Sequence, residues 1–181
     1  MSGLYNYGNI AKETTVKPGS CKILIGIKSY FTSIAVPTAH AAAGESKTIS
    51  DDHTFTSGKG FIECLGYVRQ KGAGKGSTVG ELGSKTMKWE ISVPVSGLSA
   101  PLLEFIEGGL NNDFIILAAD GCLCGVDADT YLQFGCENIP AQLSVDGDLG
   151  TIEGGFKGAT LKFESYGVPN VYTGEIDLYG A

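Results

Sequence analysis

The strictest constraint on the fold is an alternation of apolar and polar residues in the middle of the chain. Its apolar members are Met87, Trp89, Ile91 and Val93, with Lys88, Glu90 and Ser92 between them. Successive side chains of a β-strand point to opposite faces, so the pattern predicts a strand with one face in a core and the other in water. The same period of two returns near the C-terminus, over residues 161–164 and 172–178. We therefore expect a chain built largely from half-buried strands.

Further strands are predicted where short apolar runs are closed by polar or glycine residues. These runs cover residues 21–31, 61–69 and 114–119. The third run meets Asp120-Gly121, the two-residue pattern of a tight hairpin, and is expected to return through residues 122–126. The turn residues at 167–170 predict a second hairpin between the two C-terminal segments, at an edge of the sheet.

One short helix is expected after Ser99, a favoured N-cap residue, with Pro101 in its first turn and Gly108-Gly109 at its end. The 27 glycines are about twice the usual share of ~7%, which suits turns rather than helices. The expected fold is mainly β: an antiparallel β-sandwich or half-barrel with one short α-helix packed on it. The length of 181 residues, without a linker or repeat, predicts a single domain over residues 1–181.

Two polar stretches interrupt this pattern. Residues 35–60 are predicted to be a long loop, and loops longer than about 15 residues in compact domains usually have a function. Residues 71–78 are rich in glycine and include Lys71 and Lys75. They depart from a phosphate-binding loop, because Arg69 occupies the first glycine position and Gly76 occupies the place of the required Ser or Thr. A mobile basic loop that contacts an acidic neighbour is the favoured interpretation.

Charge is divided unevenly along the chain. Residues 1–89 hold eleven Lys/Arg and six Asp/Glu, a balance of +5, whereas residues 90–181 hold two and fourteen, a balance of −12; together they give the net charge of −7. If the fold keeps the halves apart, opposite ends of two copies would attract each other. If the halves interleave in the sheet, the charges mix. The net negative charge and the single arginine disfavour specific binding of nucleic acid.

No catalytic, metal or cofactor site is predicted. His40 and His53 lie in the long polar stretch without partners at zinc-ligand spacing, and we expect both to be solvated. The five cysteines lack a CxxC pair and are expected to be reduced. No segment approaches the roughly 18 apolar residues of a membrane span, and no secretory signal is expected at the N-terminus. A hydrolase that uses acids of the second half stays open, because their spacing in space is not visible in the sequence.

The order of these elements resembles the tail tube, or major tail, proteins of bacteriophages, which are related to the tube protein of type VI secretion systems. The resemblance lies in the strand pattern, the long excursion after the first strands, the short helix after the Trp89 strand and the alternating C-terminal segment that ends at Tyr179. It implies a structural, non-enzymatic subunit that closes into stacked six-membered rings and conducts DNA. The protein would then lie in the virion, assembled in the host cytoplasm, in contact with other tail or head proteins.

The resemblance also implies positions for the contacts between subunits. Residues 1–17 would form an N-terminal arm and residues 35–60 a stacking loop. Candidate acids of the tube lumen are Glu90, Glu164, Glu175 and Asp177. Candidate contacts between subunits are Lys71, Lys75, Glu45, Lys47, Asp51 and Asp52. Lys88 and Lys162 share the polar strand faces, so the lumen would not be uniformly acidic.

Two other functional classes remain open at this point. One is a different virion component, such as a capsid decoration or head–tail connector protein. The other is a monomeric β-sandwich module that binds sugars or proteins, which would show a ligand-shaped cleft.

Overall fold

The structure is a computed structural model that describes residues 22–38, 41–64, 74–119, 130–150, 155 and 157–180. It is mainly β, with one ten-stranded mixed sheet, a two-stranded sheet and one short helix, as the sequence predicts. The strands are β1 (Ile23–Ile27), β2 (Phe31–Ser33), β3 (Thr48–Ile49), β4 (Thr54–Phe55), β5 (Ile62–Cys64), β6 (Gly74–Val79), β7 (Thr86–Ser96), β8 (Asp113–Ala119), β9 (Tyr131–Phe134), β10 (Ala141–Asp148), β11 (Gly158–Tyr166) and β12 (Asn170–Tyr172). The helix α1 spans Ala100–Gly109.

The large sheet runs in the order β3-β12-β9-β8-β10-β11-β7-β6, and β1 pairs with β8 and with β5. β1 covers one edge of β8, while β9 and then β10 cover the other edge. The pairs of strands are antiparallel, as expected, except β3 with β12, which is parallel. The two ends of the sheet, β3 and β6, do not pair, so the described strands form no closed barrel.

The pair β1–β8 is buried on both faces because hydrophobic residues follow one another along it without alternation. One core cluster holds Phe114 and Ile116 of β8 together with residues of β7, β10 and β11. The other holds Leu117 of β8 together with residues of β3, β9 and β12. The helix α1 packs on the first cluster through Leu102, Phe105 and Ile106, as predicted.

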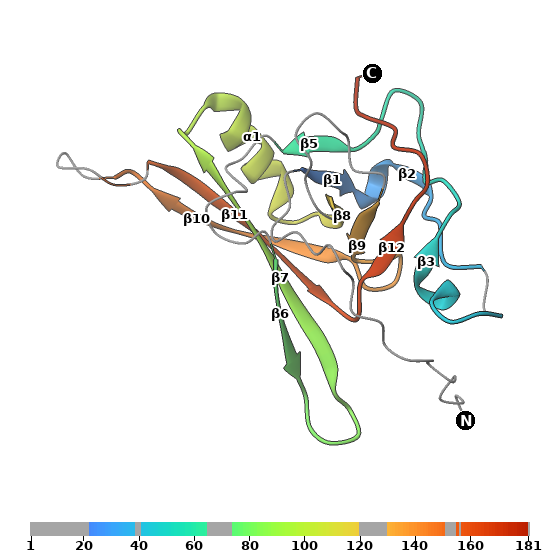
Figure 1. Cartoon of the computed structure of the whole chain (residues 1–181). Coiled ribbons are helices and arrows are strands. Elements are labelled where there is room, and N and C mark those ends of the chain that lie inside the picture. The colour runs from blue at the N-terminus through green and yellow to red at the C-terminus, as the bar shows by residue number, and fades with distance from the viewer. Residues whose placement is uncertain are drawn as a thin grey trace.

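Four strands extend away from this body. We call β10, β11, β7 and β6 the projecting sheet. Its hairpins β6–β7 and β10–β11 project from the body in different directions, one toward the bottom and one toward the left of Figure 1. Pro94 lies on the part of β7 that β6 does not cover, which is a position that tolerates the missing N–H of proline.

The predicted C-terminal hairpin is wrong. Both edges of β11 are occupied, by β10 and by β7, so β11 lies inside the sheet rather than at an edge. β12 instead pairs with β9 and β3. The first predicted strand also differs, because a 3-10 turn at Lys28–Tyr30 divides it into β1 and β2. The predicted turn at 120–121, its return strand and the N-terminal arm lie outside the described residues.

The two halves of the sequence interleave in the sheet. β1 from the first half lies beside β8 from the second, and β3 from the first half lies beside β12 from the second. Ion pairs join the halves at Lys88–Glu164, with 2.9 Å between Nζ and Oε1, and at Lys28–Asp113, with 3.8 Å between Nζ and Oδ2. The opposite charges of the two halves are therefore mixed by the fold.

Candidate assembly surfaces

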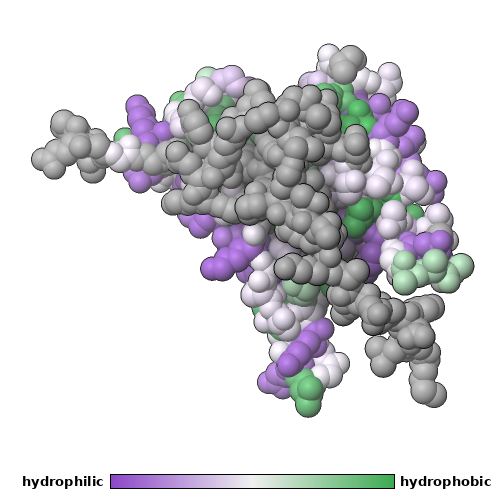
Figure 2. Space-filling model, viewed as in Figure 1, coloured by the Kyte–Doolittle hydropathy of each residue, from purple (hydrophilic) through white to green (hydrophobic). Residues whose placement is uncertain are grey.

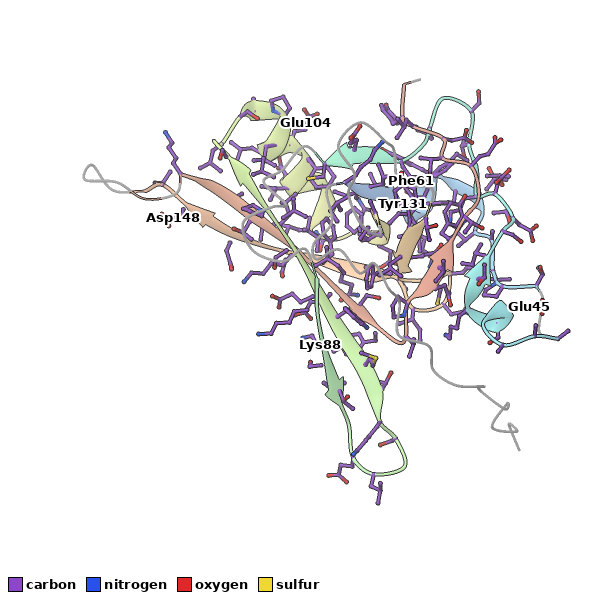
Figure 3. The ribbon with its side chains drawn as sticks, in the orientation of Figure 1. Glu45, Phe61, Lys88, Glu104, Tyr131 and Asp148 are labelled. Atoms are coloured by element: carbon purple, nitrogen blue, oxygen red, sulfur yellow. The ribbon has the colours of Figure 1, made fainter. Side chains whose placement is uncertain are left out.

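The projecting sheet has one apolar and one polar face. Ile91, Val93, Leu161, Phe163 and Leu143 are buried in the first core cluster on one face. The polar residues between them lie on the other face, as the alternation predicts. Figure 3 labels one of them, Lys88 of β7. A sheet with one solvated face is an ordinary antiparallel arrangement, so the polar face alone does not require a partner.

Glu90 and Glu164 are direct cross-strand neighbours on this polar face. Like charges in such positions repel, and two lysines offset the repulsion. Lys88 pairs with Glu164 and Lys162 pairs with Asp146. The hydrogen bond to Glu164 raises the pKa of Lys88, and the bond to Asp146 raises the pKa of Lys162. The face therefore presents alternating rather than uniformly negative charge.

The other two candidate lumen acids lie elsewhere. Glu175 and Asp177 follow β12 with exposed side chains, and their backbones hold the C-terminal segment in place. The N–H of Glu175 donates to Oδ1 of Asp52 at 2.7 Å, and the carbonyl of Asp177 accepts from the N–H of Phe61 at 2.8 Å. The structure thus brings Glu90 and Glu164 together and separates them from Glu175 and Asp177.

Residues 35–60 are not a structureless loop in their described part, because they contain β3, β4 and a 3-10 turn at Glu45–Lys47. The Glu45 carboxylate accepts the N–H groups of Ala41 and Ala42, both at 2.8 Å, and Asp52 accepts from Glu175. Lys47 and Asp51 have exposed side chains. Lys75 is exposed on β6 opposite Glu90, and Lys71 lies outside the described residues.

His53 fastens this segment to the body of the protein. Its side chain is buried, with 2% exposure, so the prediction of a solvated histidine is wrong. The N–H of Ala35 donates to Nδ1 at 3.0 Å, which leaves Nε2 as the protonated nitrogen that donates to Oε1 of Gln133 at 2.9 Å. The imidazole stacks on the Tyr172 ring with centroids 4.5 Å apart. The neutral form of His53 therefore satisfies both of its nitrogens.

The pKa of His53 follows from this environment. Burial away from water lowers the pKa below its ordinary value of 6.5, although the Gln133 hydrogen bond and the charge of Asp52 oppose the shift. Protonation would place a second N–H on Nδ1 against the donor N–H of Ala35. Its aromatic neighbours Phe31, Phe61 and Tyr172 come from other parts of the sequence, so no pattern next to His53 indicates its burial.

We expect the free energy of unfolding to fall as the pH is lowered below 6.5. Between the lowered folded pKa and 6.5 the unfolded chain binds a proton that the folded chain does not, so stability decreases by up to about 1.4 kcal/mol per pH unit. Urea titrations at several pH values from about 7.5 to about 5 measure this slope. The variant His53→Gln removes the titrating group and should show a shallower slope. Equal slopes in the two proteins would contradict the expectation.

Two strand edges of the projecting sheet are open. In the described part of the chain, β6 pairs only with β7, so its other edge has no strand beside it. β10 pairs with β8 only through Ala141 and Gln142, and the edge of residues 143–148 that faces away from β11 is unpaired among the residues described. Neither open segment contains a proline, which is a common protection of edges, and Lys75 is their only lysine. As far as the described residues go, each is an unpaired edge of the kind with which another strand can pair.

No cluster of His, Cys, Asp or Glu in the described part of the chain could hold a metal ion. Cys136 is a free thiol, and Cys64 packs against the first core cluster. Cys21, Cys122, Cys124 and His40 lie outside the described residues. None of the helices in the ranges described is long and apolar enough to cross a membrane.

No protein-family model, curated protein or solved structure matches this chain.

Proposed function

We propose that this chain is a structural subunit that pairs with copies of itself into rings, and that the rings stack into a tube of the kind found in bacteriophage tails. The observation that carries the proposal is the pair of open edges on the projecting sheet. One edge is β6, with six residues, and the other is residues 143–148 of β10. Edges of matched length on opposite sides of one sheet suit a head-to-tail contact, and such a contact forms a ring when the rotation from copy to copy closes.

Strand direction supports the same contact. β10, β11, β7 and β6 are antiparallel in turn, so β6 runs opposite to β10. When β6 of one copy lies beside β10 of the next, the new pair is antiparallel as well. An even number of strands thus repeats without a break in the hydrogen-bonding pattern. Closure would leave neither of these two edges available for uncontrolled pairing.

The polar face of the projecting sheet suits a subunit of a tube that conducts DNA. With the apolar face on the core of each subunit, the polar face of a closed ring would line its interior. Glu90, Glu164, Lys88 and Lys162 give this face charges of both signs. DNA could pass such a surface without being held by a continuous run of basic groups. Under this proposal the protein belongs to a virion, where other tail or head proteins contact the ends of the tube, and it has no catalytic role.

Electron microscopy and sedimentation of the purified chain test the proposal. We expect rings or tubes of uniform width. Rings that never stack would favour a connector or decoration role over a tube. A chain that stays monomeric at high concentration would contradict self-assembly and favour a ligand-binding module.

Proline in β6 tests whether the ring forms through this edge. Neighbouring residues of a strand direct their N–H groups to opposite sides, so only one of Ser77→Pro and Thr78→Pro removes an N–H that bonds to β7. The other variant should keep the melting temperature of the wild type and lose its rings, because the proline ring blocks the outer edge. If the subunits pair through another surface, each of the two variants that still folds would form rings.

A further inference from the structure

The tips of the two hairpins of the projecting sheet carry the most exposed large apolar side chains of the described residues. Leu82 at the tip of β6–β7 is 94% exposed, and Leu149 beyond β10 is 75% exposed. The other exposed large apolar residues are between 46% and 55% exposed. Figure 2 shows a hydrophobic patch at the lower end of the molecule, where the β6–β7 hairpin ends, beside hydrophilic residues. A single exposed leucine is unremarkable on a protein surface, and the case depends on the two together.

The two tips share one local sequence pattern. Residues 80–84 read Gly-Glu-Leu-Gly-Ser, and residues 147–151 read Gly-Asp-Leu-Gly-Thr. The glycine after each leucine has a positive φ, +96° at Gly83 and +69° at Gly150. Turns usually select glycine, proline, asparagine, aspartate or serine, and a leucine with 94% or 75% exposure buries little of its side chain within the monomer. The same acid-leucine-glycine tip thus occurs twice, each time with the leucine in water.

Each tip is held by its own hydrogen bonds. The N–H of Ser84 donates to the carbonyl of Glu81 at 3.0 Å, and the N–H of Gly150 donates to Oδ1 of Asp148 at 2.8 Å. Figure 3 labels Asp148, the last residue of β10, on the side of the molecule toward which this hairpin projects. The backbone next to each leucine is therefore arranged before any partner is bound, which lowers the entropic cost of a contact.

The tips lie at opposite ends of the same strands. Gly158 of β11 pairs with Ser96 near the tip that carries Leu149, whereas Tyr166 pairs with Lys88 near the tip that carries Leu82. In a ring built from this sheet, all copies of Leu82 would lie on one rim and all copies of Leu149 on the other. Both rims belong to one barrel, so they face each other when two rings stack.

We propose that the Leu82 tip of one ring binds the Leu149 tip of the next ring, so that a second copy of this chain is the partner of both tips. This contact rests on the proposed ring and adds the surface through which rings stack. It is heterologous, because the two rims differ, and it repeats once for every subunit around the ring. Many weak contacts of this kind act together, so stacking is expected to depend steeply on each leucine.

Serine variants of the two leucines test the contact in the full chain. Leu82→Ser and Leu149→Ser should each form rings as readily as the wild type, with loss of tubes in electron micrographs. Leu103→Ser is the matched control, because Leu103 is 49% exposed on α1 and belongs to neither hairpin, and this variant should form tubes. When rings of Leu82→Ser and Leu149→Ser are mixed, each retains one intact rim, so pairs of rings and nothing longer should appear.

The outcomes separate the two proposals. The contact between the tips would be wrong if both serine variants form tubes, or if their mixture contains only single rings. Neither result would contradict the proposed ring. A wild-type chain that forms no ring would overturn the ring and the rim contact together.

Discussion

The substitution His53→Ala is expected to lower the free energy of unfolding by about 3–5 kcal/mol, which is a large part of the roughly 5–15 kcal/mol that stabilises a domain. The imidazole fills a space between Phe31, Phe61 and Tyr172, so its removal leaves a cavity. It also leaves the N–H of Ala35 and Oε1 of Gln133 without their bonds, and each orphaned group costs about 1–3 kcal/mol.

Urea unfolding at neutral pH measures this loss. Ser46→Ala, on the exposed surface of the same segment, is the control and should change stability by less than about 0.5 kcal/mol. Hydrogen exchange should show faster exchange of the amides in β3 and β12 in His53→Ala, because β3 belongs to this segment and the segment loses its contact with Tyr172 of β12. A loss of less than about 1 kcal/mol would show that the histidine does not fasten the segment.

The second large effect is expected for Gly60→Ala, at about 3 kcal/mol of lost stability. A Cβ at this position would lie 2.6 Å from the carbonyl oxygen of Asp177 and 2.6 Å from the carbonyl carbon of Leu178. Both are backbone atoms, so the C-terminal segment must move. The movement would break the bonds that join Phe61 to Asp177 and to Tyr179.

Gly108→Ala provides the matched control for this change. Gly108 lies within α1, and a Cβ there meets nothing within 4 Å, so the substitution should stabilise the protein by up to about 1 kcal/mol through helix propensity. Thermal unfolding of the two variants should therefore shift in opposite directions. Equal melting temperatures for Gly60→Ala and the wild type would mean that the C-terminal segment moves without a loss of stability.

Local patterns in the sequence predicted the elements whose structure is set locally. The alternation from Met87 to Val93 predicted β7 and the face that each side chain occupies. Pro101 and Gly109 marked the ends of α1, and Ser99 is its N-cap residue. At that cap the carbonyl of Ser99, rather than its hydroxyl, accepts the N–H of Leu103 at 3.0 Å. Apolar periodicity and helix-end residues depend on neighbours in the chain, and the sequence shows those directly.

Pairing between distant segments was not predictable in the same way. The turn residues at 167–170 suggested that β12 returns along β11, yet β7 and β10 already occupy both edges of β11. His53 was expected in water because its neighbours in sequence are polar. Its burial depends on Gln133 and Tyr172, which lie on strands that the local sequence does not connect to it. The open edges of the projecting sheet likewise depend on which strands pair, and no motif marks them.

The attachment of residues 35–60 has a consequence for the order of folding. The backbone N–H of His53 donates to the hydroxyl of Tyr172, which is 119 residues further along the chain, and β3 pairs with β12. During synthesis the N-terminal part emerges first, and loop closure over so long a separation slows folding. The second core cluster therefore cannot form until the last strand has left the ribosome. Until then the second core cluster lacks Tyr172, and its residues Ile49, Phe61 and Leu117 stay partly uncovered. A nascent chain stalled before β12 would therefore expose an apolar surface that chaperones bind.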